Sequence, residues 1–424
     1  MSLYTLDDFG PDVLRGRRVL ARVDFNVPLQ AGEVTDTARL EAALPTLVEL
    51  TGGGARLVLI SHCGRPKGQV DPRYSLRPVA AKLGELLGKA VGFAQDCVGA
   101  AARRALEETG PGEVCLLENL RFHAGETAAD PAFVSRLAEL ADVYVGDAFG
   151  TAHRAHASVV GVAERLPHKA AGRLLVREVE VLGALLGSPE RPFAGILGGA
   201  KIEGKIDTLE NLLPRLDVLL LGGGMANTFL AARGHDLAES LVEADRVELA
   251  GEILTRAEAC GTRVVLPSDL VVTNDLDAVG PDAVGTDAVG TDAVGTDAVG
   301  PDQPRRIETV GVADVPAGTK AVDVGVETRR RFAEECAAAA TVFWNGPLGV
   351  FEKTPFDAGT RALAKSLAAA SGFTVVGGGE TVAAVRQTPG ASGRIGHLST
   401  GGGASLELLA GKKLPGVTVL EKTP

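Results

Sequence analysis

The sequence lacks the marks of a secreted or membrane-spanning protein. Its first residues, "MSLYTLDDFG", contain neither a basic start nor an apolar core, and a secretory signal needs both. The longest apolar runs are broken by Gly, Pro or a charged residue within about 15 residues, which is too short to cross a bilayer. We therefore expect a cytoplasmic protein that has no membrane as a partner.

Paired cysteines and an excess of positive charge are missing as well. The five cysteines are odd in number, widely scattered and without a CxxC pair. This usage predicts free thiols in a reducing cytoplasm, and neither a disulfide framework nor a zinc site. The net charge of −11 speaks against nucleic acid as a partner. Any site for an anion must then be a local basic patch within an acidic protein.

Short runs of Val, Leu and Ile alternate with Ala- and Leu-rich helical stretches along the whole chain. Examples are "ARLVLISHCGRP" followed by "LRPVAAKLGELLG", and "DVLLLGGGMANTFLAA". Continuous apolar strands alternating with helices predict the α/β class, with parallel sheets covered on both faces. Repeated units of this kind form doubly wound, Rossmann-like folds, which bind ligands beyond the carboxyl ends of their strands.

Two segments depart from this alternation. The helical stretch "AAGRLLVREVEVLGALLG", residues 170–187, separates an Arg-rich first half from a Gly-rich second half. We interpret it as a bridge between two domains, and an ordinary packing helix is the alternative. Residues 277–302 repeat DAVG with a period of five, which fits neither a helix nor a strand. We expect a surface insertion there, and no calcium site, because the EF-hand pattern is absent.

Glycine triplets occur at residues 52, 222, 377 and 401. The first is expected in a plain helix-to-strand turn. The other three, with Gly198-Gly199, stand at strand ends or helix starts, where backbone N–H groups can bind a phosphate. We expect the triplet at 401 to form a helix N-terminus.

The stretch "GGAKIEGKID" is close to a P-loop but has Ile206 where Ser or Thr should hold Mg²⁺, so a true P-loop is not expected. If a helix begins here, Lys201 and Lys205 share one face. The alternative is a pair of solvated lysines. With the P-loop hydroxyl missing, Glu380 and Glu352 are the candidate carboxylates for a metal.

The first half of the chain concentrates arginine at predicted strand ends and early helical turns. Arginine's planar fork suits carboxylate and phosphate, so these positions predict an acidic small molecule as ligand. Separate surface ion pairs are the alternative, and Arg22 fits that alternative best. The set comprises Arg22, Arg39, Arg65, Arg121 and Arg154, with His62, His153, Asp24, Asn26 and Asn119 nearby.

One domain for an anionic metabolite and one for nucleotide phosphates is the layout of a two-substrate phosphoryl-transfer enzyme. Several blocks, among them "RVDFNVP", "LISHCGRP", "LLENLRFHAGE", "GGAKIEGKI", "WNGPLGVFE" and "HLSTGGGASLELLAG", resemble those of phosphoglycerate kinases in order along nearly the whole chain. The resemblance implies a transferase of glycolysis and gluconeogenesis that works reversibly between 1,3-bisphosphoglycerate with ADP and 3-phosphoglycerate with ATP, using Mg²⁺. It also implies a cytoplasmic monomer.

The resemblance implies two Rossmann-like domains that are joined by a helix and close a hinge-bending cleft. We expect an N-terminal domain of residues 1–171 plus 405–424, an interdomain helix at 172–188, and a C-terminal domain of residues 189–404 that carries the insertion.

The resemblance also implies roles for individual residues. 3-Phosphoglycerate would be bound by Asp24, Asn26, Arg39, His62, Arg65, Arg121 and Arg154. The nucleotide would be bound by Gly199, Ala200, Lys201, Lys205, Gly223, Gly325, Asn345, Pro347, Glu352, Gly378, Gly379, Glu380 and Thr381, with Glu380 also at the metal. The phosphoryl group in transfer would meet Arg39, Lys201, Gly379, Gly401, Gly402 and Gly403.

The chain departs from the family pattern at a few positions. Glu380 stands where the family usually has Asp, and its extra methylene puts the metal distance or preference in question. Gly146, Val326 and Glu203-Gly204 replace the usual Asn, Pro and Ser-Asp. Two other functions remain open: a kinase or ligase for another acidic metabolite, and a non-enzymatic nucleotide-binding regulator of a partner.

Overall fold

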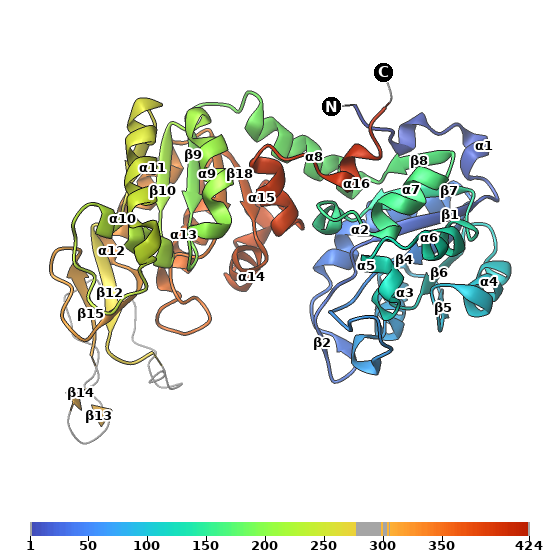
Figure 1. The fold of residues 1–424 in the computed structure, drawn as a ribbon, viewed down its shortest axis with the longest axis horizontal. Helices are drawn as coiled ribbons and strands as arrows, with labels where there is room; N and C mark the ends of the chain where they lie inside the picture. The colour runs from blue at the N-terminus through green and yellow to red at the C-terminus, as the bar shows by residue number, and fades with distance from the viewer. Residues whose placement is uncertain (1, 277–297, 300–302, 305, 423–424) are drawn as a thin grey trace. The chain divides into compact units, whose positions relative to one another are not determined.

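Six parallel strands form the central sheet of the first unit of the computed structural model, which describes residues 2–276, 298–299, 303–304 and 306–422 (Figure 1). The unit comprises Met1–Leu182 and Lys412–Pro424. Its strands, in spatial order, are β5 (Val91–Ala94), β6 (Val114–Leu117), β4 (Arg56–Ile60), β1 (Arg18–Val23), β7 (Val143–Asp147) and β8 (His168–Ala171). After β1, the chain forms β4, β5 and β6 on one side of this strand, and then β7 and β8 on its other side. In doubly wound folds, ligands bind at the point where the strand order reverses in this way.

Helices pack around this sheet because its inner strands are apolar on both faces. β6 and β7 consist entirely of buried residues, as parallel strands covered by helices require. The core joins residues such as Leu57 and Val145 to Leu40 and Leu83 of the covering helices. The helices are α1 (Pro11–Leu14), α2 (Ala38–Gly52), α3 (Arg77–Leu87), α4 (Gly99–Glu108), α5 (Ala124–Thr127), α6 (Pro131–Ala138), α7 (Val162–Arg165) and α16 (Pro415–Thr418), and β2 (Leu29–Gln30) and β3 (Glu33–Val34) form a short hairpin.

The second unit, Gly183–Gly411, has a six-stranded parallel sheet of its own. Trp344 and Phe332 are buried in its core. The strands, in spatial order, are β11 (Arg263–Val265), β10 (Val218–Leu221), β9 (Phe193–Leu197), β17 (Thr341–Asn345), β18 (Phe373–Gly377) and β19 (His397–Leu398). The helices are α9 (Ile206–Leu212), α10 (Gly223–Ala232), α11 (Val247–Ala259), α12 (Val326–Ala338), α13 (Ala358–Ala369), α14 (Gly379–Gln387) and α15 (Gly403–Leu409).

A small antiparallel sheet in the second unit was not predicted from the sequence. It consists of β15 (Ile307–Gly311), β12 (Asp269–Thr273) and β16 (Lys320–Val324). Its strands come from both sides of the repeat segment 277–302, most of which lies outside the described residues; β13 (Ala298–Val299) pairs there with β14 (Gln303–Pro304). In the part of the chain that is described, no helix has the length and apolar character needed to cross a membrane.

The helix α8 (Arg173–Leu186) runs from the first unit into the second. The chain returns to the first unit after Gly411, later than residue 405, where the sequence placed this boundary. The difference has a local cause, because α15 is tied to α9: Thr208 Oγ1 donates to the Leu406 carbonyl (2.9 Å) and Asn211 Nδ2 to the Leu409 carbonyl (2.7 Å).

Asp147, at the end of β7, is fully buried. Its Oδ1 accepts a hydrogen bond from the Leu175 amide (3.1 Å) at the start of α8, while Oδ2 has no partner among the described residues. Burial raises the pKa of this carboxyl to about 7, although Thr46 and the α8 backbone amides oppose the shift. The folded protein therefore keeps a proton that the unfolded chain loses near pH 4.

We expect Asp147→Asn to stabilise the first unit at pH 8 and to change little at pH 4. Stability from the protonated carboxyl is lost as the pH rises from about 4 to 7, and the amide escapes that loss, so we expect a gain of roughly 1–4 kcal/mol in the free energy of unfolding. Urea unfolding at the two pH values measures it. Asp142→Asn is the control of opposite sign, because a hydrogen bond from Arg18 lowers the pKa of Asp142. A gain independent of pH would contradict the prediction.

Candidate functional site

A cavity of about 190 Å³ lies in the first unit, where loops leave the carboxyl ends of β1, β4, β6 and β7. Such loops converge on one edge of a parallel sheet, which explains why residues far apart in sequence meet here. All seven residues expected to bind 3-phosphoglycerate line the cavity, and Gly64, Gly150 and Thr151 were not predicted from the sequence. The full lining is Asp24, Asn26, Arg39, His62, Gly64, Arg65, Arg121, Gly150, Thr151 and Arg154.

Positive charge dominates this cavity, which we call the arginine cavity. Arg39 Nη1 donates to the Asn26 carbonyl (2.8 Å) and lies 3.3 Å from Asp24 Oδ2. Arg121 Nη1 donates to the Gly64 carbonyl (2.7 Å). Burial, together with the nearby charge of Arg154, lowers the pKa of Arg121 to about 10. Arg121 remains a cation at neutral pH, so a bound anion would relieve the repulsion between these arginines.

Arg22 is the residue whose environment differs most from the one expected from the sequence. It is 1% exposed, so the surface ion pair considered for it is wrong. Its Nε donates to Ser158 Oγ (2.9 Å), and that hydroxyl donates to buried Glu126 (2.7 Å). Its Nη2 lies 3.2 Å from His62 Nδ1. An arginine can only donate, so His62 Nδ1 accepts and the ring proton sits on Nε2.

The protonation of two other groups follows from this arrangement. Burial holds the pKa of His62 well below its usual value, against the opposing charge of Asp24. His62 is thus neutral, with its ring proton on Nε2, and it lines the arginine cavity. Burial alone would raise the pKa of Asp24, yet Arg39 and Arg22 hold it below its usual value. Asn119 has a structural role: its Oδ1 accepts from the amides of Cys63 and Arg121, so it joins two of the loops.

A second cavity, of about 350 Å³, lies in the second unit. We call it the glycine cavity. Among the residues expected to bind nucleotide, Gly199, Ala200, Gly223, Pro347, Glu352 and Glu380 line it. The sequence missed its apolar side, which includes Leu241, Leu270, Leu276, Val324 and Val350. An apolar wall with a few polar groups is typical of small-molecule sites and suits a nucleotide base.

Three backbone loops build the glycine cavity by bonding to one another. The Gly199 amide donates to the Pro347 carbonyl (2.7 Å), the Gly223 amide to the Leu348 carbonyl (3.0 Å), and the Met225 amide to the Gly199 carbonyl (3.0 Å). A Cβ on Gly223 would lie 2.7 Å from the nitrogen and the oxygen of Gly199. The loops come this close only because side chains are absent.

The other residues expected to bind nucleotide do not line this cavity. Lys205 Nζ lies 3.0 Å from the position that a Cβ on Gly199 would occupy. Burial lowers the pKa of Lys205, with Glu380 and Glu243 opposing. Thr381 Oγ1 accepts from the Gly346 amide (2.7 Å). Asn345 is buried, and its Nδ2 lacks a hydrogen-bond partner among the described residues. Gly325, Gly378 and Gly379 stand at the starts of α12 and α14.

The helical spacing suggested for Lys201 and Lys205 is wrong. Lys201 precedes a 3₁₀ turn, Glu203–Lys205, and α9 begins only at Ile206. The side chains of the two lysines therefore do not follow the i, i+4 geometry of an α-helix. The glycine triplets agree better with expectation. Gly52–Gly54 closes α2 before β4, and α15 begins at Gly403, with Gly402 at φ +48° and the Gly401 amide donating to Ser399 Oγ (3.1 Å).

The departures from the family pattern are accommodated locally. A Cβ on Gly146 would lie 3.0 Å from Leu420 Cδ1 and 3.3 Å from the Tyr144 ring, so glycine suits this packing. Val326 is exposed at the first residue of α12. Glu203 is exposed and lies 3.9 Å from Arg246.

Two α/β units, one with an arginine cavity and one with a glycine cavity, match the layout expected of one class of protein, an enzyme with an acidic metabolite and a nucleotide as substrates. A sequence model of the phosphoglycerate kinase family matches residues 6–412, and the chain belongs to this family. It is therefore a kinase that acts as an ATP:3-phosphoglycerate phosphotransferase.

Similar proteins agree with this assignment. The phosphoglycerate kinase of Moorella thermoacetica is 51% identical over 420 residues, covering 99% of each chain. That of Desulforudis audaxviator is 52% identical over 409 residues, covering 96% of this chain and 97% of the relative. The structure of the Coxiella burnetii phosphoglycerate kinase has a TM-score of 0.81 and 36% identity, and covers 99% of this chain and 98% of its own.

Proposed function

We propose that 3-phosphoglycerate binds in the arginine cavity and ATP in the glycine cavity, and that the phosphoryl group passes directly between them. One observation carries this proposal: four arginines converge on one small cavity in which Asp24 is the lone acidic side chain. Asp24 already pairs with Arg39, so Arg65, Arg121 and Arg154 are left to bind an anion. A phosphate and a carboxylate together supply the negative charge that such a set requires.

The transfer that we propose is in line and forms no phosphoenzyme. Catalysis then consists of positioning the reactants and stabilising the charge of the transferring group. We assign Arg39 and Lys201 to that charge. The amides of Gly379, Gly402 and Gly403 would meet its equatorial oxygens, because no side chain blocks them. The Gly401 amide, which donates to Ser399 Oγ (3.1 Å), would have to leave that hydroxyl to join them. His62 would donate Nε2–H to the acid, and Arg22 would fix the proton on that atom.

Glu380 is the residue that we propose to hold Mg²⁺. It lines the glycine cavity and acts electrostatically on Lys205, so its carboxylate is close to where the nucleotide phosphates would lie. Carboxylate oxygen is the ligand that Mg²⁺ prefers, and the residues present therefore fit the ion. Bound there, Mg²⁺ would neutralise phosphate charge.

The two cavities lie in different units, so direct transfer needs them to meet. We propose that the units close over the substrates, with α8 as the bridge between an N-terminal acid-binding domain and a C-terminal nucleotide-binding domain. We further propose that the chain works as a monomer in the cytoplasm. These proposals rest on the family resemblance.

A coupled assay for 1,3-bisphosphoglycerate formation, run in parallel with Mg²⁺ and Mn²⁺, tests the proposed sites. We expect turnover with Mg²⁺, and we expect Glu380→Asp to retain it while the apparent affinity for the metal changes, because only the reach of the carboxylate differs. Glu352→Asp, also in the glycine cavity, is the matched control and should leave metal affinity unchanged. No turnover on 3-phosphoglycerate, but turnover on another acid, would favour the other kinase. ATP binding without any turnover would favour a regulatory protein.

A further inference from the structure

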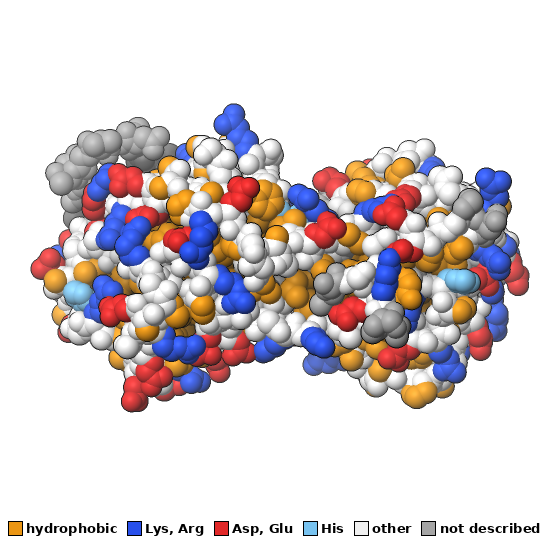
Figure 2. All heavy atoms as spheres, turned by 90° about the horizontal axis from the view of Figure 1, so that it is seen from above, with side chains coloured by type: hydrophobic (Ala, Val, Ile, Leu, Met, Phe, Trp, Pro, Cys, Tyr) orange, Lys and Arg blue, Asp and Glu red, His pale blue; other side chains and the backbone are white. Residues whose placement is uncertain are grey.

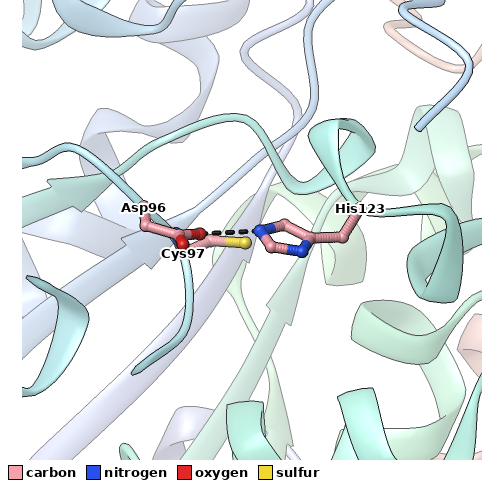
Figure 3. A group of neighbouring side chains, drawn as sticks. All are labelled: Asp96, Cys97 and His123. Carbon is pink, nitrogen blue, oxygen red and sulfur yellow. Dashed lines mark hydrogen bonds and ion pairs between the residues drawn. The ribbon is translucent and has the colours of Figure 1, made fainter. Parts of the chain in front are cut away.

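Three side chains that commonly bind metals meet at one point of the first unit (Figure 3). Asp96 and Cys97 lie in the loop between β5 and α4, and His123 stands directly before α5. One ligand atom from each lies within 4.8 Å of the others. The cluster shares none of its residues with the lining of the arginine cavity or of the glycine cavity.

The local contacts hold these groups in place. His123 Nε2 lies 2.7 Å from Asp96 Oδ1, and the same oxygen accepts from the Cys97 amide at 2.7 Å. Figure 3 shows the sulfur of Cys97 beside the contact between the histidine and the carboxylate. The His123 ring packs at 5.2 Å from the Phe133 ring, which fixes its orientation. Asp96 Oδ2 is not used in these bonds.

The donor set matches the chemistry of zinc. Zn²⁺ takes thiolate, imidazole and carboxylate at about 2.3, 2.0–2.1 and 2.0–2.2 Å, which places tetrahedral ligand atoms about 3.3–3.6 Å apart. The distance of 2.7 Å between His123 Nε2 and Asp96 Oδ1 must lengthen by less than about 1 Å to reach that spacing. The charges of the thiolate and the carboxylate would balance that of the ion. This balance matters because four cationic side chains line a cavity of about 390 Å³ together with His123: Arg65, Lys67, Arg121 and Arg154.

We propose that Asp96, Cys97 and His123 form a binding site for one Zn²⁺ ion. The Cys97 S–H bond breaks as the S–Zn bond forms, and the proton goes to solvent. His123 contributes the lone pair of Nε2 and carries its ring proton on Nδ1, and Asp96 contributes a carboxylate oxygen. Water or a small anion takes the fourth position. The proposal does not depend on the proposed function.

A nucleophilic cysteine is the other chemistry that this trio could suggest, and the burial of Cys97 argues against it. The thiol is 1% exposed, and burial raises its pKa well above the usual value. A reactive cysteine needs a lowered pKa and access to a substrate. A metal ion can overcome the raised pKa of the thiol, whereas a substrate cannot, because coordination to the metal itself deprotonates the thiol.

Cobalt provides the test, because Co²⁺ occupies zinc sites and a thiolate bound to it absorbs in the near ultraviolet. The full-length protein, freed of metal by a chelator, is titrated with Co²⁺. We expect a thiolate-to-cobalt band that saturates at one equivalent and disappears when Zn²⁺ is added. We expect Cys97→Ala and His123→Gln to lose it. Cys115→Ala is the matched control, because Cys115 is another buried free thiol of the same unit, and it should retain the band.

Absence of the band in the unaltered protein would overturn the proposal, as would a band that survives in Cys97→Ala. If Cys97→Ala does not fold, His123→Gln decides, because glutamine keeps a donor to Asp96 at a half-buried position. Loss of the band in that folded variant supports the site, and retention refutes it. The readout is spectroscopic, so the outcome is independent of whether the chain phosphorylates 3-phosphoglycerate.

Discussion

Arg39→Ala is expected to lower kcat by about 10²- to 10³-fold, the usual cost of removing one donor to a developing charge. The guanidinium is about one-third exposed, and its Nη1 is held by the Asn26 carbonyl and Asp24. Arg39 lies in the first turn of α2 with its head in the arginine cavity, so it contributes little to the core. The thermal unfolding temperature should therefore change much less than turnover. Steady-state kinetics and a melting curve measure the two effects.

Two further variants separate charge from geometry. Arg39→Lys keeps the positive charge but loses the planar fork of the guanidinium. Its kcat should lie between those of the parent and of Arg39→Ala. Arg73→Ala is the control, because this side chain is 81% exposed and pairs with Asp71, two residues away. It should leave kcat unchanged. Turnover close to that of the parent in Arg39→Ala would remove Arg39 from the catalytic role that we assign to it.

Gly346→Ala is expected to abolish nucleotide binding at ordinary ATP concentrations and to destabilise the second unit by roughly 2–4 kcal/mol. Gly346 has a φ of +96°, and its Cβ would lie 2.3 Å from the Gly198 carbonyl oxygen and 2.4 Å from the carbonyl carbon. These are backbone atoms, so they cannot rotate away. Any shift would strain the bonds from the Gly198 amide to the Asn345 carbonyl (2.9 Å) and from Gly199 to Pro347 (2.7 Å), which shape the glycine cavity.

ATP titration and urea unfolding test this prediction. Gly251→Ala is the matched control: this glycine lies within α11, and a Cβ there meets no atom within 4 Å. Alanine should raise stability at that site by up to about 1 kcal/mol and leave ATP binding unchanged. A Gly346→Ala variant that binds ATP as the parent does would show that the loops tolerate separation, contrary to the close approach described above.

Acidic and basic side chains are interspersed over the face of the protein shown in Figure 2. Overall charge therefore says little about where an anion binds. The arginine cavity is positive because four strand ends bring their loops together, and a net charge of −11 is compatible with it. The sequence predicted that patch from the positions of the arginines, because carboxyl ends of parallel strands share one edge of a sheet.

Local rules accounted for other parts of the fold as well. Apolar runs alternating with helical stretches predicted both parallel sheets, since only strands buried on both faces carry such runs. The same rules failed where a neighbour outweighs local preference. Lys201 and Lys205 would share one face only if a helix ran through both, but α9 begins at Ile206. The segment 405–411 looked like part of the returning C-terminus, but hydrogen bonds from α9 hold it.

The sequence by itself determined the α/β class, the family, and the positions of the arginines that line the arginine cavity and of the glycine-rich loops. Each of these follows from periodicity, composition or motifs that are local in the chain. The tertiary structure alone decided that Arg22 bonds to His62, that Gly346 touches Gly198, and that His123 meets Asp96 and Cys97. No spacing rule connects the partners in each contact, because they come from separate strands and loops whose meeting depends on the strand order of the folded sheet. The number and spacing of the cysteines argued against a zinc site. The site at Asp96, Cys97 and His123 could therefore be proposed only from the folded structure.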